Sequence, residues 1–142
     1  KALSVDNFTA KGGLPPDVVE REFDEAKVLV NTSTREGFPN TFLHAWARGI
    51  PVFTFIDPDQ LIKRYGLGYV ARDLKDMETG LRRFFCGELT FDFREIRGVF
   101  ADNFTIQAAV DNYDALFGSL IGPQNAGSLI SFPKGSHDED CR

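Results

Sequence analysis

Residues 28–56 read VLVNTSTREGFPNTFLHAWARGIPVFTFI, and the order of apolar and polar residues in this stretch decides the fold class. Val28–Val30 and Val52–Ile56 are short continuous apolar runs, which are typical of buried strands. Between them, residues 40–48 carry apolar side chains at helical spacing, and Gly49 follows as a helix terminator. A strand, a helix and a second strand in this order predict a parallel sheet covered by helices.

The alternation of strands and helices continues on both sides of this stretch. We expect further strands at Val5–Thr9 and Tyr69–Ala71, and helices at Pro16–Ala26, between Pro58 and Gly66, at Lys75–Cys86, at Phe93–Ala101 and at Thr105–Leu120. Asp17 with Glu20 three residues later matches a capping box, and Asn40 is a candidate helix cap. The pattern predicts an α/β, Rossmann-like three-layer domain with a parallel sheet and a helical C-terminal end.

The last expected helix carries an apolar stripe, formed by Ile106, Ala109, Val110, Tyr113, Leu116, Phe117 and Leu120. We interpret this stripe as a face that packs on the core. From Gly122 onward Gly, Pro, Ser and Asn dominate, so residues 122–142 are expected to form an extended or disordered tail. The expected domain therefore spans residues 1–121.

Composition limits the partners of the chain. Its 142 residues carry a formal charge of −5, which disfavours nucleic acid and anionic membranes as main partners. Apolar runs stay far below the ~20 residues that span a bilayer. Cys86 and Cys141 lack the close spacing of a zinc site, so no metal is expected. We expect a cytoplasmic location, with peripheral membrane association left open.

The loop Asn31–Asn40 is the expected site of chemistry, because ligands of open parallel sheets bind beyond the carboxyl ends of the strands. Free amides at the start of the following helix can receive a phosphate or hydroxyls. Gly37 leaves room for a ligand near the backbone. The carboxylate of Glu36 can accept hydrogen bonds from two vicinal sugar hydroxyls. Alternatively, Glu36 only pairs with Arg35 or caps the helix.

The run EGFPNTFLxAWAxGIPV at residues 36–52 resembles the C-terminal domain of family 4 retaining glycosyltransferases, which have the two-domain GT-B fold. Weaker support comes from Ala26–Ser33, Asp57–Asp59, Gly68–Ala71 and Asn103–Thr105. The resemblance covers roughly residues 5 to 121. It implies that this chain is one half of a GT-B fold and binds a nucleotide-diphosphate sugar as donor substrate.

The family's motif has two glutamates separated by seven residues, the first for the donor sugar and the second for the ribose. Glu36 occupies the first position, and His44 stands at the second. An imidazole can accept one hydrogen bond and donate another, but it cannot hold both ribose hydroxyls as a carboxylate does. The resemblance therefore leaves two alternatives for His44: a ligand contact, or a surface histidine without a ligand.

Further donor contacts are implied for the residues around Glu36. Backbone contacts to the diphosphate and sugar would fall on Gly37, Phe38 and Asn40, since Pro39 has no amide hydrogen. On the expected helix, Thr41, His44 and Arg48 share one face. We therefore expect Thr41 and His44 at the cleft, opposite the apolar face formed by Phe42, Leu43 and Trp46.

The resemblance implies a hexosyltransferase-like enzyme that works without a metal cofactor. It also implies a partner, the N-terminal acceptor-binding domain of the same polypeptide, and a first strand upstream of Lys1. We assign no catalytic residue and expect this fragment alone to be inactive. A degenerate, non-catalytic relative that has lost donor binding is the alternative. A generic doubly wound domain for another phosphate ligand rests on fold analogy only.

Overall fold

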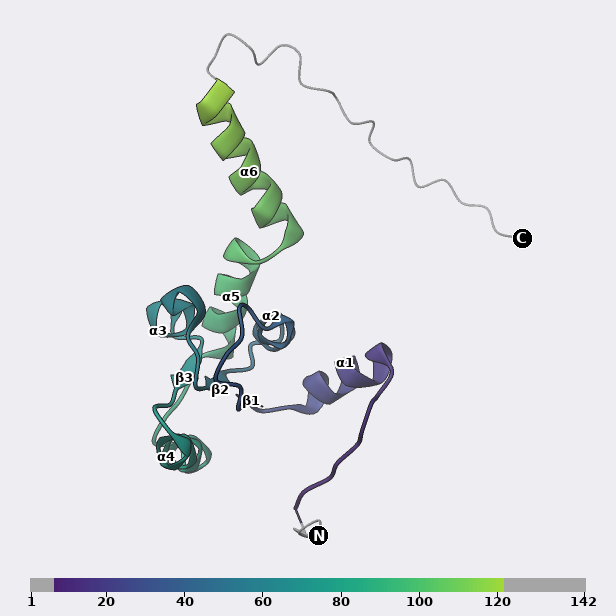
Figure 1. Cartoon of the computed structure of the whole chain (residues 1–142), viewed down its shortest axis with the longest axis vertical. Coiled ribbons are helices and arrows are strands. Elements are labelled where there is room, and N and C mark those ends of the chain that lie inside the picture. Colours follow the sequence, from purple (N-terminus) through teal and green to yellow (C-terminus); the bar gives the residue numbers. More distant parts are fainter. Residues whose placement is uncertain (1–6, 122–142) are drawn as a thin grey trace, which may run out of the picture. The chain divides into compact units, whose positions relative to one another are not determined.

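The computed structural model describes residues 7–121, so the expected tail at 122–142 lies outside the described residues (Figure 1). The elements in chain order are α1 (Pro16–Glu25), β1 (Leu29–Asn31), α2 (Asn40–Trp46), β2 (Val52–Thr54), the 3₁₀ turn η1 (Pro58–Gln60), α3 (Leu61–Tyr65), β3 (Gly68–Val70), α4 (Leu74–Phe85), α5 (Phe93–Asn103) and α6 (Ile106–Ile121). The chain divides into two compact units, with the boundary between Thr105 and Ile106.

The three strands of the first unit form one parallel sheet in the order β1-β2-β3. Leu29 pairs with Val52, and Val52 pairs with Gly68, so the strands are aligned without stagger at their amino ends. Their carboxyl ends therefore lie at one edge of the sheet. This confirms the α/β class and the parallel sheet, in a form that is compatible with a Rossmann-like fragment.

Helices cover both faces of the sheet (Figure 1). On one face Val52 packs in a cluster with Trp46 of α2 and Ile96 of α5, all of them buried. On the other face Phe53 packs with Met77 of α4. Because successive residues of β2 point to opposite faces, this fully buried strand belongs to both clusters. The expected three-layer arrangement is thus present around the small sheet.

Gly49 ends α2 and lets α5 pack closely. Its φ of +77° is left-handed, a conformation in which glycine has no steric cost. The Gly49 and Ile50 amides donate to the carbonyls of Trp46 and Ala45, both at 2.9 Å, which is a Schellman arrangement. A Cβ on Gly49 would lie 2.5 Å from the Phe93 carbonyl oxygen. The glycine is needed for both the turn and the contact.

Two of the expected caps are wrong. Pro15 is the N-cap of α1, and its carbonyl accepts from the amides of Val18 and Val19, while no side chain caps this helix. Asp17 instead pairs with Arg21 at 2.7 Å. At α2 the N-cap is Pro39, so Asn40 is the first helical residue and caps nothing.

The expected strand Val5–Thr9 is not found where the structure describes it. Asn7 lies in a turn, and residues 8–10 have no regular structure. Val5 and Asp6 lie outside the described residues. The other expected strands and helices are present with boundaries shifted by up to two residues.

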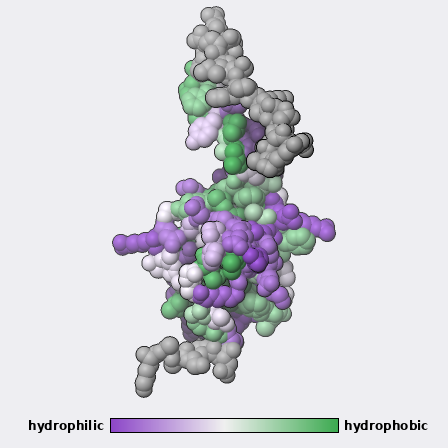
Figure 2. All heavy atoms as spheres, turned by 90° about the vertical axis from the view of Figure 1, so that its right-hand side faces the viewer, coloured by the Kyte–Doolittle hydropathy of each residue, from purple (hydrophilic) through white to green (hydrophobic). Residues whose placement is uncertain are grey.

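The apolar stripe of α6 belongs to the second compact unit, and the expectation that it packs on the core stays a prediction. Its large side chains are 44% to 87% exposed: Ile106, Val110, Tyr113, Leu116, Phe117 and Leu120. Figure 2 shows strongly hydrophobic residues at the surface of this helix. Within the described part of the chain, no helix has the length and apolarity to cross a bilayer.

Candidate functional site

A groove of about 510 Å³, called the β1 groove below, lies at the carboxyl end of β1. Its wall is formed by the strand itself, by the following loop and by the first turn of α2, through Leu29, Val30, Asn31, Thr32, Ser33, Glu36, Pro39, Asn40 and Thr41. Three of the expected site residues, Glu36, Asn40 and Thr41, therefore share one groove. Gly37, Phe38 and His44 do not line it.

Glu36 is held in place by two neighbours in the same loop. The Ser33 hydroxyl donates to Oε1 at 2.5 Å, and the Asn31 amide nitrogen lies 3.4 Å from Oε2. Asn31 is itself fixed, because its Oδ1 accepts from the Ser33 backbone amide at 2.7 Å in an Asx turn. The exposed carboxylate keeps lone pairs for further hydrogen bonds. It is thus a pre-oriented acceptor at the groove wall.

Both alternative roles of Glu36 are absent from the described residues. No ion pair joins Arg35 to Glu36 there, since the carboxylate turns toward Ser33 and Asn31. The N-cap of α2 is Pro39, so Glu36 does not cap this helix either. What remains is a loop carboxylate with local positioning bonds and open access to the groove.

Phe38 anchors the loop instead of facing the groove. Its ring lies 6.0 Å from the ring of Trp46 and 6.1 Å from that of Phe104, measured between centroids. A contact with Phe42 at 6.5 Å completes this aromatic cluster. The cluster ties the segment after Glu36 to α2 and to the end of α5. The expected backbone donor role of Phe38 stays a prediction.

Gly37 has open space around it. A Cβ at this position would meet no heavy atom within 4 Å, and its φ is outside the left-handed region. The fold of this chain therefore does not require glycine there. A requirement would arise only from a molecule that approaches the backbone beside Glu36.

His44 lies against α1. Its Nδ1 is 2.8 Å from Oε1 of Glu20, and its ring stacks on Phe23 with centroids 5.6 Å apart. The second oxygen of Glu20 accepts from Arg48 at 2.6 Å, and Arg48 also pairs with Asp24. His44 is exposed on the polar face of α2, as expected, but its partners belong to the protein.

Asn31, Thr32 and Ser33 are groove residues that the motif did not single out. A signal for Asn31 is present in the sequence, because Asn side chains favour Asx turns that bond to the backbone amide two residues on. The hydrogen bonds from Asn31 and Ser33 to Glu36 span five and three residues. These short-range hydrogen bonds depend on the conformation of the loop, which the residue spacing alone does not predict.

The loop after β3, the other edge strand, has its own polar network at the same end of the sheet. Asp76 accepts from the Arg72 side chain at 2.9 Å, from the Arg72 amide at 3.0 Å and from the Tyr69 hydroxyl at 2.8 Å. The Arg72 side chain, followed by these other donors, holds the pKa of Asp76 well below its usual range. The bond to Asp76 raises the pKa of Tyr69. This carboxylate belongs to the framework of α4.

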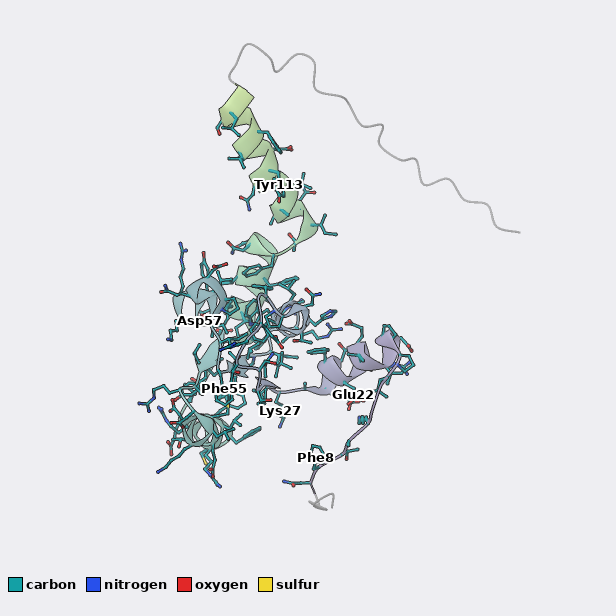
Figure 3. All side chains as sticks on the ribbon, in the orientation of Figure 1. Phe8, Glu22, Lys27, Phe55, Asp57 and Tyr113 are labelled. Atoms are coloured by element: carbon teal, nitrogen blue, oxygen red, sulfur yellow. The ribbon has the colours of Figure 1, made fainter. Side chains whose placement is uncertain are left out.

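The loop after β2 contains a second internally used carboxylate. Asp57, labelled in Figure 3, accepts from the Ile62 amide at 2.8 Å through Oδ1 and so fixes the start of α3. Its buried Oδ2 has no hydrogen-bond partner in the described part of the chain. The next turn holds Asp59 and Gln60 at φ of +50° and +59°, a strained conformation for residues with a Cβ.

A larger groove of about 570 Å³ follows α4, and its lining is mainly apolar: Leu74, Met77, Glu78, Leu81, Arg82, Phe85 and Cys86. The two charged residues of this groove, Glu78 and Arg82, form an ion pair with each other at 2.9 Å. The β1 groove combines an oriented carboxylate with hydroxyl and amide groups, so it suits a polyhydroxylated ligand better.

Comparison with protein-family models, with curated proteins and with solved structures found no match.

Proposed function

We propose that this chain is the donor-binding domain of a retaining glycosyltransferase and holds a nucleotide-diphosphate sugar in the β1 groove. The observation that carries the proposal is the Glu36 carboxylate, which Ser33 and Asn31 orient at the wall of this groove. The groove lies where parallel α/β sheets bind ligands. Glu36 also begins the segment 36–52 that resembles this family of enzymes.

In this proposal Glu36 accepts hydrogen bonds from two neighbouring hydroxyls of the donor sugar. Asn40 and Thr41 supply amide and hydroxyl groups to the same ligand from the first turn of α2. Gly37 gives the sugar access to the backbone, since no side chain in the described part of the chain fills the space beside it. These are positioning contacts, and the groups that complete the reaction would come from an acceptor-binding domain that forms the other half of a GT-B enzyme.

Titration calorimetry of the full chain tests this proposal. UDP, GDP, ADP and dTDP are compared with their glucose and mannose conjugates. We expect at least one sugar conjugate to bind more tightly than its bare nucleotide, because Glu36 contributes only where a sugar is present. Absence of binding at millimolar concentrations, in a sample with a cooperative thermal transition, would reject donor recognition.

One observation favours the second candidate, a non-catalytic relative that has lost donor binding. His44, which stands at the ribose position of the family motif, is engaged by Glu20 and Phe23 of α1. The substitution His44→Glu separates the candidates. The change is made in a Glu20→Gln background, because a second carboxylate beside Glu20 would repel it. Tighter nucleotide binding supports a ribose position, whereas unchanged binding supports the degenerate relative.

A further inference from the structure

The charge of the β1 groove is unfavourable for a diphosphate. Among the described residues that line it, Glu36 is the only charged one. The whole chain carries −5, so no broad positive field offsets this carboxylate. A nucleotide diphosphate brings further negative charge to the same place. A cation next to the groove would offset this negative charge when the ligand proposed above binds.

Many basic side chains of the first unit are already paired with acids. The pairs are Lys11 with Glu22, Arg21 with Asp17, Arg48 with Glu20 and Asp24, Arg72 with Asp76, Arg82 with Glu78, and Arg83 with Glu88. Each of these cations would lose a protein contact by turning to a ligand. They are poor candidates for an anion site.

Arg35 is different in both position and pairing. It is exposed, it belongs to the loop that forms the groove, and it directly precedes Glu36. It has no hydrogen bond or ion pair to another residue among those described. The neighbouring Glu36 carboxylate accepts hydrogen bonds from Ser33 and Asn31 and forms no ion pair with Arg35 in the described part of the chain.

We infer that Arg35 is the anion-binding residue of this site and that it selects for a diphosphate group on the ligand. The inference rests on the proposed function. Glu36 then binds the hydroxyl groups of the uncharged sugar, while Arg35 binds the charged diphosphate. Two adjacent residues of one loop thus recognise different parts of the ligand. A guanidinium suits this role because it can donate two parallel hydrogen bonds to phosphate oxygens.

Lys27 and Lys75 form no ion pair among the described residues either, and they give matched controls. Lys27 precedes β1 and so lies at its amino end, opposite the groove. Lys75 lies in the first turn of α4, which follows the far edge strand β3. With strands spaced by about 4.8 Å, β3 is about 10 Å from β1. Lys75 thus tests whether the cation that binds the diphosphate comes from the loop region after β3 instead of the loop after β1.

The experiment measures the Kd of the full chain for UDP, GDP, ADP and dTDP by calorimetry. For the nucleotide that binds most tightly, Arg35→Gln is expected to weaken binding about tenfold or more, as expected for the loss of a charge-assisted hydrogen bond. Arg35→Lys is expected to retain part of the affinity. The variants Lys27→Gln and Lys75→Gln are expected to match the wild type. Thermal melting checks that all variants fold.

The outcomes separate the two proposals. Equal binding by wild type and Arg35→Gln overturns the role of Arg35 and leaves the proposed function intact. A loss that appears in Lys75→Gln and not in Arg35→Gln also overturns it, and assigns the anion to the β3 side. If the wild type binds no nucleotide, the proposed function and the inference built on it both fail.

Discussion

The Ser33 hydroxyl donates a hydrogen bond to Oε1 of Glu36 across 2.5 Å. Both residues belong to one loop, so the bond fixes the carboxylate without any contribution from a distant element. Such prior orientation lowers the entropy that a ligand must remove when it binds. Ser33 is therefore expected to raise the affinity for the sugar mainly by orienting Glu36, and less through a sugar contact of its own.

Replacing Ser33 by alanine tests this relationship. We expect the Kd for the sugar conjugate to rise several-fold, corresponding to about 1 kcal/mol for one hydrogen bond, with the bare nucleotide little affected. Thr34→Ala is the control, because Thr34 is in the same loop and outside the groove lining. Calorimetry on both variants provides the comparison. Equal losses in the two would show that the loop as a whole, and not this bond, matters.

Gly37→Ala separates ligand binding from folding. The added methyl group meets no protein atom within 4 Å and needs no unusual φ, so thermal stability should stay within about 0.5 kcal/mol of the wild type. Binding of the sugar conjugate should weaken if a ligand approaches the backbone there. Unchanged affinity would place the sugar elsewhere in the groove.

The sheet was predictable because its signals are local. Val52–Thr54 lies in a continuous apolar run, and the structure buries all three residues. Gly49 was recognisable as a terminator because left-handed turns favour glycine. In contrast, the expected strand Val5–Thr9 had only β-propensity to support it, and the described part of that segment pairs with no strand.

The site was predictable only where its contacts are short in sequence. Glu36, Asn40 and Thr41 line one groove because a single strand–loop–helix unit carries them. The surroundings of His44 were not predictable, since its partner Glu20 lies on another helix, 24 residues earlier. The same contact explains why the capping box failed. The carboxylate of Glu20 pairs with His44 and Arg48, and no local sequence pattern predicts these contacts.

Gly49→Ala should destabilise the first unit. The left-handed φ alone costs a residue with a Cβ about 1–2 kcal/mol, and the Phe93 backbone at 2.5 Å adds a clash. Gly66→Ala is the matched variant, because Gly66 has a φ of +67° but no atom near its Cβ position. Chemical denaturation should give the larger loss for Gly49→Ala. A loss no greater than that of Gly66→Ala would show that α5 moves away at little cost.

The network of Asp76 predicts a pH dependence of stability. Arg72 lowers the pKa of Asp76 in the folded state below the unfolded value of about 3.9. The resulting stabilisation is complete above that value and is lost as the pH falls through the folded pKa. Asp76→Asn should therefore melt at a lower temperature than the wild type at pH 7, and the difference should shrink below about pH 4.

Glu78→Gln serves as the control for this pH series. Glu78 pairs with Arg82 on the surface, where ion pairs contribute little. Its melting temperature should stay close to that of the wild type at each pH. If Asp76→Asn shows the same pH-independent offset at pH 7 and at pH 3, its effect comes from packing and not from ionisation.

The central claim is that Glu36 holds the sugar of a nucleotide donor, and Glu36→Ala tests it most directly. Calorimetric titration compares this variant with the wild type for one sugar conjugate and for its bare nucleotide. We predict that the variant loses most of the extra affinity for the conjugate while its affinity for the bare nucleotide is kept. Equal losses for both ligands, or an unchanged preference for the conjugate, would contradict the claim.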